Sequence, residues 1–231
     1  LREAGVPFEV IPGVSSAYAV AAYAGIPVTH RREASTLAIV TGHEDPSKGP
    51  SHLDYGALVR FDTIVFLMAL SNLGQNVSRL IEAGKDPATP SAIIQSGTTP
   101  KQRTLLAPLA GIAQEAKARK ITPPSVLVVG QLANMASCLN WYESLPLFGK
   151  RVLITRPKER SDELLGGLEA LGAEVETLPM IQSRSLLGTS SAQELLIEGL
   201  SLCELVVFSS KTGVEVFFEA IYRLGRDARA L

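Results

Sequence analysis

Short apolar runs alternate with longer amphipathic segments, and this alternation constrains the fold more than any other feature. The runs are rich in Val, Ile and Leu, and they predict strands at residues 8–11, 36–41, 63–70, 92–95 and 126–129. Helical spacing covers three of the segments between them, at residues 15–24, 76–83 and 105–118. Continuous apolar strands are typical of sheets that are buried on both faces. The alternation therefore indicates an α/β layer architecture with crossover connections.

A second α/β unit begins after a break near residues 143–149, where Pro146 and Gly149 flank an apolar stretch. Strands are predicted at residues 151–155, 174–178 and 205–208, and helices from about Ser161, after residues 188–191 and from residues 209–213, which open the last helix. We therefore expect one domain at residues 1–143, a linker at 144–149 and a second domain at 150–231.

Composition and charge exclude several classes of protein. Hydrophobic residues make up 46% of the chain and the net charge is −1, which is typical of a globular protein without an electrostatic footprint for nucleic acid. Cys138 and Cys203 lie far apart, and His30, His43 and His52 lack ligand spacing, so we expect neither a disulfide framework nor a metal site. No apolar run is long enough for a membrane helix, and no signal segment is present, so a cytoplasmic location is expected.

Small residues recur where the predicted strands end. The segments are Pro12–Ser16, Thr41–Gly42 and Ser96–Thr98. Ligands of open α/β sheets bind beyond the carboxyl ends of strands, where glycine allows close backbone approach and hydroxyls donate hydrogen bonds without bulk. Such tips are also common in ordinary tight turns, but their recurrence indicates a cofactor cleft.

Several motifs in order carry a family resemblance. Val10–Ser16 (VIPGVSS), continued by Tyr23–Arg31 (YAGIPVTHR), is followed by VTGH at 40–43, VFLM at 65–68, QSGT at 95–98 with QRT at 102–104, and NWY at 140–142. This series resembles the tetrapyrrole methylases, and within them the uroporphyrinogen-III C-methyltransferases. The resemblance covers residues 1–143, with a change of subdomain expected near residues 31–36.

The second unit resembles another family. Residues 149–157 (GKRVLITRP), with GAEV at 172–175 and VFSS at 207–210, resemble the opening part of uroporphyrinogen-III synthase. The resemblance implies a partial α/β lobe of synthase type over residues 150–231, fused to the methylase domain.

The first resemblance implies methyl transfer from S-adenosylmethionine to two carbons of uroporphyrinogen III, giving precorrin-2 for sirohaem and cobalamin synthesis. Motif position implies that the cofactor contacts Ser15, Ser16, Met68 and Gly97, although turn and core geometry would also explain these residues. The macrocycle carries eight carboxylates, so its site needs cations. Arg31 is the leading candidate, and Arg32, Lys101 and Arg103 are weaker ones.

For the second unit, the resemblance implies cyclisation of hydroxymethylbilane. Arg156, Ser209 and Ser210 would then contact substrate carboxylates, or serve only as turn and cap residues. A homodimer is also implied as possible for the methylase.

The chain departs from the methylase pattern at two places. The family's glycine-rich loop and proton-transfer groups are expected upstream of Leu1, so no catalytic residue is assigned, and Ala69 stands where glycine is common. Two other interpretations stay open. The enzyme could be another tetrapyrrole methylase, or this segment could be an inactive binding or assembly module.

Overall fold

The computed structural model describes residues 1–42, 53–157, 161–181, 190–227 and 229. His43 and His52 lie outside the described residues. Contacts divide the chain into two compact units, one of residues 1–154 with 160–177 and one of residues 155–159 with 178–231.

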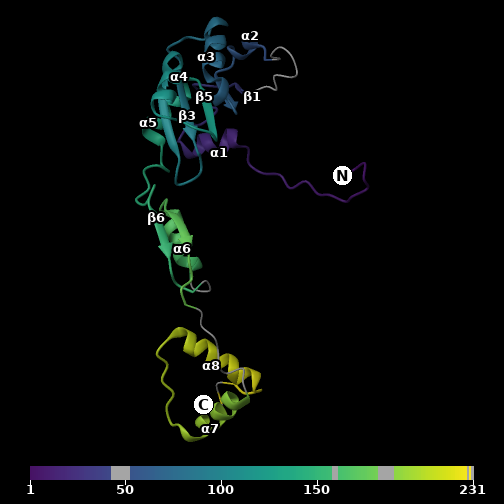
Figure 1. Ribbon diagram of the computed structural model, residues 1–231, viewed down its shortest axis with the longest axis vertical. Coiled ribbons are helices and arrows are strands. Elements are labelled where there is room, and N and C mark those ends of the chain that lie inside the picture. The colour runs from purple at the N-terminus through teal and green to yellow at the C-terminus, as the bar shows by residue number, and fades with distance from the viewer. Residues whose placement is uncertain (43–52, 158–160, 182–189, 228, 230–231) are drawn as a thin grey trace. The chain divides into compact units, whose positions relative to one another are not determined.

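A five-stranded mixed sheet forms the centre of the first unit (Figure 1). Its strands are β1 (Leu37–Thr41), β2 (Thr63–Leu67), β3 (Pro90–Gln95), β4 (Arg103–Pro108) and β5 (Ser125–Val129). Their order in the sheet is β1-β2-β5-β3-β4. β1 and β2 are parallel, whereas β5 runs antiparallel to both β2 and β3, and β4 runs antiparallel to β3. The expected α/β sheet domain is confirmed, but most of its strand pairs are antiparallel.

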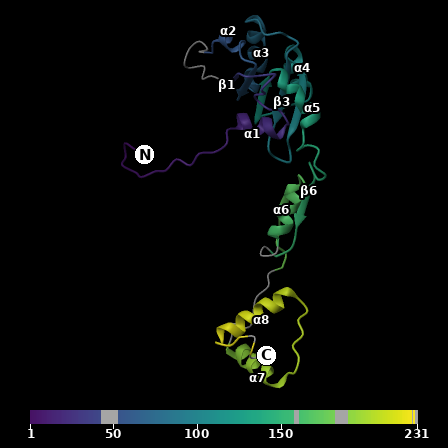
Figure 2. The same ribbon diagram turned by 180° about the vertical axis from the view of Figure 1, so that it is seen from behind.

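Helices cover both faces of this sheet, as the opposite views of Figures 1 and 2 show. One apolar core lies beneath α2 (Tyr55–Leu58), α3 (Leu73–Glu82) and α4 (Leu109–Ala118). The other core lies beneath α1 (Ser16–Tyr23), the 3₁₀ helix η3 (Gln131–Met135) and α5 (Ala136–Leu139). Neighbouring residues on a strand point to opposite faces, so Phe66 enters the first core and Val65 the second, both fully buried. Apolar residues on both faces explain the continuous apolar runs of the sequence.

A smaller pair of strands follows the first sheet along the chain. β6 (Arg151–Ile154) and β7 (Glu174–Thr177) are parallel and are joined through α6 (Asp162–Ala170). Contacts group this pair with the first unit, whereas the sequence places a domain boundary at residues 144–149.

The second unit contains α7 (Ser190–Leu202) and α8 (Lys211–Arg223). The rings of Phe208, Phe217 and Phe218 pack against one another beside α8. The Ser210 hydroxyl accepts a hydrogen bond from the Gly213 amide at 3.1 Å and caps this helix, as the sequence predicts for the start of the last helix.

Two predicted strands are wrong in this structure, and one predicted helix begins later than expected. Residues 8–11 and 205–208 form no strand, and Ile11 and Val207 are 83% and 81% exposed. Among the described residues, no strand lies beside either segment to which its amides and carbonyls could bond. The helix predicted at residues 105–118 begins only at Leu109, because residues 103–108 pair with β3 and Pro108 interrupts the pattern.

Helix length bears on membrane insertion. Across the described part of the chain, each helix is too short or too polar to cross a bilayer.

Asp62 connects the amino ends of β1 and β2. One of its carboxylate oxygens accepts hydrogen bonds from the Ser35 amide at 2.9 Å, the Thr36 amide at 2.9 Å and the Thr36 hydroxyl at 2.8 Å. The Asp62 amide in turn donates to the Thr36 hydroxyl at 2.9 Å. The Thr36 hydroxyl, followed by the two backbone amides, lowers the pKa of Asp62 below its usual value. This exchange of bonds aligns the parallel strands.

We predict that Asp62→Asn lowers the free energy of unfolding above about pH 4. The free energy of unfolding of the variant should also fall less than that of the wild type as the pH is lowered. A carboxylate with a lowered pKa in the folded state contributes stability above its unfolded pKa and loses it as the pH falls through the folded pKa. Urea unfolding measured from pH 7 to pH 3 checks this. Thr36→Val, which keeps the carboxylate but removes its strongest donor, should show an intermediate pH dependence. A pH dependence like that of the wild type in both variants would contradict the prediction.

Candidate functional site

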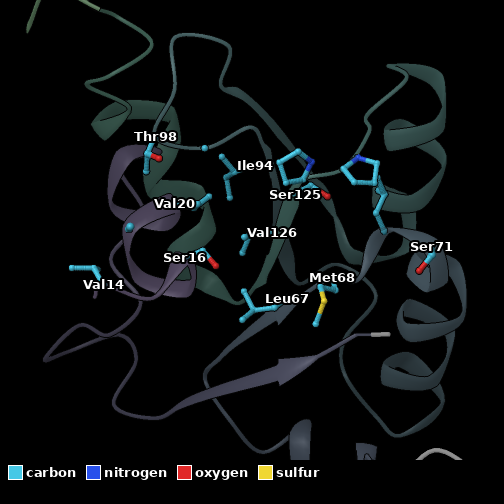
Figure 3. Close-up of a pocket in the computed structure, with 15 residues that line it drawn as sticks. Val14, Ser16, Val20, Leu67, Met68, Ser71, Ile94, Thr98, Ser125 and Val126 are labelled. Atoms are coloured by element: carbon cyan, nitrogen blue, oxygen red, sulfur yellow. The ribbon is translucent and has the colours of Figure 1, made fainter. Parts of the chain in front are cut away.

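One cavity opens at an edge of the five-stranded sheet (Figure 3). Its volume is about 800 Å³, within the range typical of small-molecule sites. The lining comes from the start of α1, the end of β2 and the residues after it, the end of β3 with the turn that follows, and the start of β5. The lining residues are Val14, Ser16, Ala19, Val20, Leu67, Met68, Leu70, Ser71, Ile94, Gly97, Thr98, Pro123, Pro124, Ser125 and Val126.

Strand direction explains why these segments meet. β2 and β3 both run antiparallel to β5, which lies between them, so the two run in the same direction and their carboxyl ends lie at one edge. The amino end of β5 lies at that edge as well, with Gln95 paired to Ser125. The cavity therefore occupies the position at which α/β sheets bind ligands.

Three of the four residues predicted to contact a cofactor line this one cavity. Ser16 lies in the first turn of α1, Met68 follows β2, and Gly97 follows β3. Figure 3 shows Ser16, Met68 and Val126 around the same space. The fourth predicted residue, Ser15, does not line the cavity. Its hydroxyl accepts a hydrogen bond from the Ala17 amide at 3.3 Å and caps α1.

The backbone of the cavity wall adopts an uncommon conformation. Met68, Ser96 and Thr98 have φ angles of 53°, 49° and 67°, in the left-handed region that side chains disfavour. Such residues cost about 1–3 kcal/mol each and persist where the surrounding structure holds them. Met68 and Thr98 line the cavity and Ser96 adjoins it, so three of the four non-glycine residues with positive φ in the described part of the chain gather at this site; the fourth, Lys120, follows α4.

Gly97 is required by a close contact with α1. A Cβ atom at this position would lie 2.5 Å from Cγ1 of Val20. Because a β-branched side chain has little rotamer freedom in a helix, Val20 cannot readily move away. The glycine thus lets α1 pack directly against the turn after β3.

The lining is apolar with a few hydroxyl groups. None of its residues is charged, and Ser16, Ser71, Thr98 and Ser125 carry the hydroxyls. An uncharged lining of this kind fits a ligand with an extended apolar or aromatic surface and several hydrogen-bonding groups. It offers no cation to a polyacid. In the part of the chain that the structure describes, no cluster of three His, Cys, Asp or Glu residues could hold a metal ion.

Other predicted positions do not reach the cavity lining. Gly42, at the end of β1, instead packs against Ala69, whose side chain is buried beneath α3. The methyl group of Ala69 therefore does not narrow the cavity. Arg31 lies in the turn closed by His30 and Ala34, and the chain then passes to Thr36 beside Asp62, at the amino end of β1. Arg156, Ser209 and Ser210 belong to the second unit.

The sequence analysis missed Val20, Ile94 and Val126 as lining residues. Val20 follows Ser16 by four positions and so shares its helix face, which is a usable sequence signal. Ile94 and Val126 lie opposite each other in the β3–β5 register. No sequence spacing indicates that pairing, because it depends on which strands become neighbours.

The Gly97–Val20 contact makes a specific prediction. Gly97→Ala should destabilise the protein by about 1–3 kcal/mol, because the added methyl group overlaps the stiff Val20 side chain. Adding Val20→Ala to the same chain should restore part of the loss by removing the overlapping atoms. Gly111→Ala is the matched control, because open space surrounds that glycine in α4. Thermal unfolding compares the variants, and equal stability of the Gly97 and Gly111 variants would refute the packing argument.

Known proteins resemble this chain in sequence and fold. Residues 1–113 match the family described as Tetrapyrrole (Corrin/Porphyrin) Methylases. A Ruminiclostridium josui protein named "Porphyrin biosynthesis protein HemD" is 37% identical over 238 residues, which cover 100% of this chain and 46% of that protein. A Methanosarcina barkeri protein named "S-adenosyl-L-methionine-dependent uroporphyrinogen III methyltransferase" is 47% identical over 135 residues, 58% of this chain and 53% of that protein. The chain thus spans about half the length of these relatives.

A solved structure shows the same fold. The cobalt precorrin-4 methyltransferase, a cobalamin biosynthetic enzyme, aligns with a TM-score of 0.52 and 20% identity, and the alignment covers 57% of this chain and 55% of the other. This alignment shows that the two chains share a fold. Residues 1–113 of this chain therefore form a domain of the tetrapyrrole methylase family.

Proposed function

We propose that this chain is part of an enzyme that transfers methyl groups from S-adenosylmethionine to carbon atoms of uroporphyrinogen III, giving precorrin-2. The observation that carries the proposal is the convergence of Ser16, Met68 and Gly97 on one cavity. The names of the relatives support it, since the Methanosarcina barkeri protein is named for this substrate and cofactor. The pathway would be tetrapyrrole biosynthesis, towards sirohaem or cobalamin.

The cavity suits S-adenosylmethionine better than it suits the macrocycle. Apolar side chains such as Val20, Ile94 and Val126 offer surfaces against which an adenine ring can pack. The hydroxyls of Ser16 and Ser125 can hydrogen-bond the ribose and the amino-acid group. Eight carboxylates, by contrast, would lose their hydration in this uncharged lining without gaining a cationic partner. We therefore assign the cavity to the cofactor and place the substrate at its mouth.

In this methyl transfer the protein itself forms no covalent bond to the substrate or the cofactor. The bound cofactor supplies a methyl group on a positively charged sulfur, and the electron-rich pyrrolic carbon is the nucleophile. The residues of the chain bind and orient the two reactants. Holding them in line saves about 7–11 kcal/mol of the barrier relative to free encounter. Met68 is placed for such a role, since its exposed side chain lies at the cavity edge.

The substrate carboxylates need cations outside the cavity. Arg31 is exposed and stays our candidate for one such contact, but its turn precedes β1, at the end of the sheet opposite the cavity, so it could reach only a peripheral carboxylate far from the reacting carbon. A charge-assisted hydrogen bond of this kind contributes about 1.5–3 kcal/mol.

Calorimetry with S-adenosylhomocysteine and product mass test the proposal. The full-length enzyme of which this chain is a part should bind this product of the cofactor, and its incubation with S-adenosylmethionine and uroporphyrinogen III should add two methyl groups to the macrocycle. Met68→Lys should weaken binding of this product at least about tenfold, because it places a charged ammonium group at the edge of an uncharged, apolar cavity that the ligand would otherwise fill. Met180→Lys is the matched control, an equally exposed methionine in the second unit. Absence of binding, or equal loss in both variants, would contradict the proposed site.

We further propose that residues 150–231 belong to a uroporphyrinogen-III synthase part that cyclises hydroxymethylbilane. The unit β6–α6–β7 supports this, because a parallel strand pair joined by a helix is the opening element expected of such an α/β lobe. Arg156 follows β6, and Ser209 and Ser210 precede α8, at positions where they could contact substrate carboxylates.

Conversion of hydroxymethylbilane tests this second part separately. The protein should form uroporphyrinogen III, and Arg156→Ala should lower the rate. Arg223→Ala, which removes an arginine already paired with Glu219 on the surface of α8, should leave the rate unchanged. Formation of only the spontaneous cyclisation product by the wild-type protein would refute the synthase assignment and leave the methylase assignment intact.

A further inference from the structure

The turn between β3 and β4 forms one wall of the cavity and is held by several hydrogen bonds. The Ser96 amide donates to the Pro124 carbonyl at 2.9 Å, which ties the turn to the residues before β5. The Thr99 hydroxyl donates to the Ser96 carbonyl at 2.7 Å. The Thr98 amide is satisfied by a side chain, since it donates to Oε1 of Gln102 at 2.9 Å. The backbone of the wall is therefore completed by the amide group of Gln102.

Gln102 is buried, with only 2% of its surface exposed. Its Nε2 atom donates to Oε1 of Glu143 at 3.0 Å, and the same oxygen accepts the Thr104 hydroxyl at 2.6 Å. Burial without partners would cost an amide several kcal/mol, so these bonds fix the orientation of its two ends. Gln102 thus connects a residue of the cavity wall to Glu143, which lies 41 positions further along the chain.

The residues before Glu143 reach the other side of the cavity wall. The Glu143 amide donates to the side-chain oxygen of Asn140 at 3.3 Å. The indole of Trp141 donates to the Ala22 carbonyl in α1 at 3.2 Å, and its ring packs on Tyr23. α1 in turn presses Val20 against Gly97. The segment Asn140–Glu143 therefore braces both α1 and, through Gln102, the turn after β3.

We infer that Gln102 is a positioning residue for the cofactor, which holds the backbone of Gly97 and Thr98 in its binding conformation through the link to Glu143. The inference rests on the proposed function of the cavity. Thr98 and Ser96 sit in a disfavoured backbone region, so the wall needs partners that hold it there. A side chain at position 102 must accept from the Thr98 amide and donate to the Glu143 carboxylate. Glutamine does both with one planar group.

The chemistry of the pair suggests a substitution series. Gln102→Leu removes both bonds and leaves the Thr98 amide and the Glu143 carboxylate without this partner. Gln102→Glu retains an acceptor for Thr98 but sets two carboxylates against each other. Adding Glu143→Gln to Gln102→Glu restores the donor between the two positions, with the amide and the carboxylate exchanged. The paired exchange separates the hydrogen-bond requirement from side-chain volume.

Hydrogen exchange of the Thr98 amide measures directly, without any ligand, how well the hydrogen bond to Gln102 protects the backbone of the cavity wall. We expect exchange at least tenfold faster than in the wild type for Gln102→Leu and for Gln102→Glu, and protection close to wild type for the paired exchange. The dissociation constant for S-adenosylhomocysteine should follow the same order, with a loss of about tenfold or more in the single variants. An effect on the KM for S-adenosylmethionine should exceed the effect on kcat.

Lys85→Met controls for general loss of stability. Lys85 donates to the Phe61 carbonyl at 2.7 Å beside Asp62, at the opposite end of β2, so its loss removes a partly buried hydrogen bond far from the cavity. At a matched fall in melting temperature, this variant should keep wild-type exchange at Thr98 and wild-type affinity. Unchanged exchange in Gln102→Leu, or no recovery in the paired exchange, would overturn the inference. Failure of the wild-type protein to bind S-adenosylhomocysteine would instead count against the proposed function, and the exchange of Thr98 would still decide the role of Gln102 in the wall.

Discussion

Burial of both faces of one mixed sheet is the constraint on which the site depends. Each inner strand must pack against helices on two sides, so it alternates between two apolar cores and leaves little freedom in its register. With β5 inserted between β2 and β3, those two strands run in one direction and end at the same edge. The cavity lies at that edge because two strand ends and the first turn of α1 leave a space there that no core side chain fills. The packing of the sheet therefore determines where a ligand can bind.

The cavity wall shows where the protein accepts local strain. Three left-handed residues adjoin the space, and a glycine between two of them allows α1 to make direct contact. A wall of this kind presents backbone groups and short hydroxyls to a ligand without bulky side chains in the way. The network of Gln102 and Glu143 offsets the strain from outside the cavity. The site is therefore shaped by residues that do not themselves line it.

The sequence predicted much of the sheet and part of the site. Strong apolar runs identified β1, β2, β3 and β5, and the position of the family motifs pointed to Ser16, Met68 and Gly97, which line one cavity. The hydrophobic pattern did not predict β4. Leu105 and Leu106 lie in this strand, but α4 follows it directly, so the apolar residues of the strand fit the helical spacing of the helix. The pattern also failed at residues 8–11, whose apolar composition indicates a strand although no partner strand pairs with them here. The bonds from Gln102 to Thr98 and Glu143 could not be predicted, because they depend on side-chain contacts between distant segments.

The central claim is that the cofactor binds at the ends of β2 and β3. The three methionines allow a direct measurement, since the chain labelled with ¹³C at its methionine methyl groups should give three signals. Met68 lines the cavity, whereas Met135 packs against the core beneath α1 without lining the cavity, and Met180 belongs to the second unit. On addition of S-adenosylhomocysteine, the Met68 methyl signal should shift markedly and the Met180 signal should stay in place. Binding that leaves the Met68 signal unmoved would contradict this account.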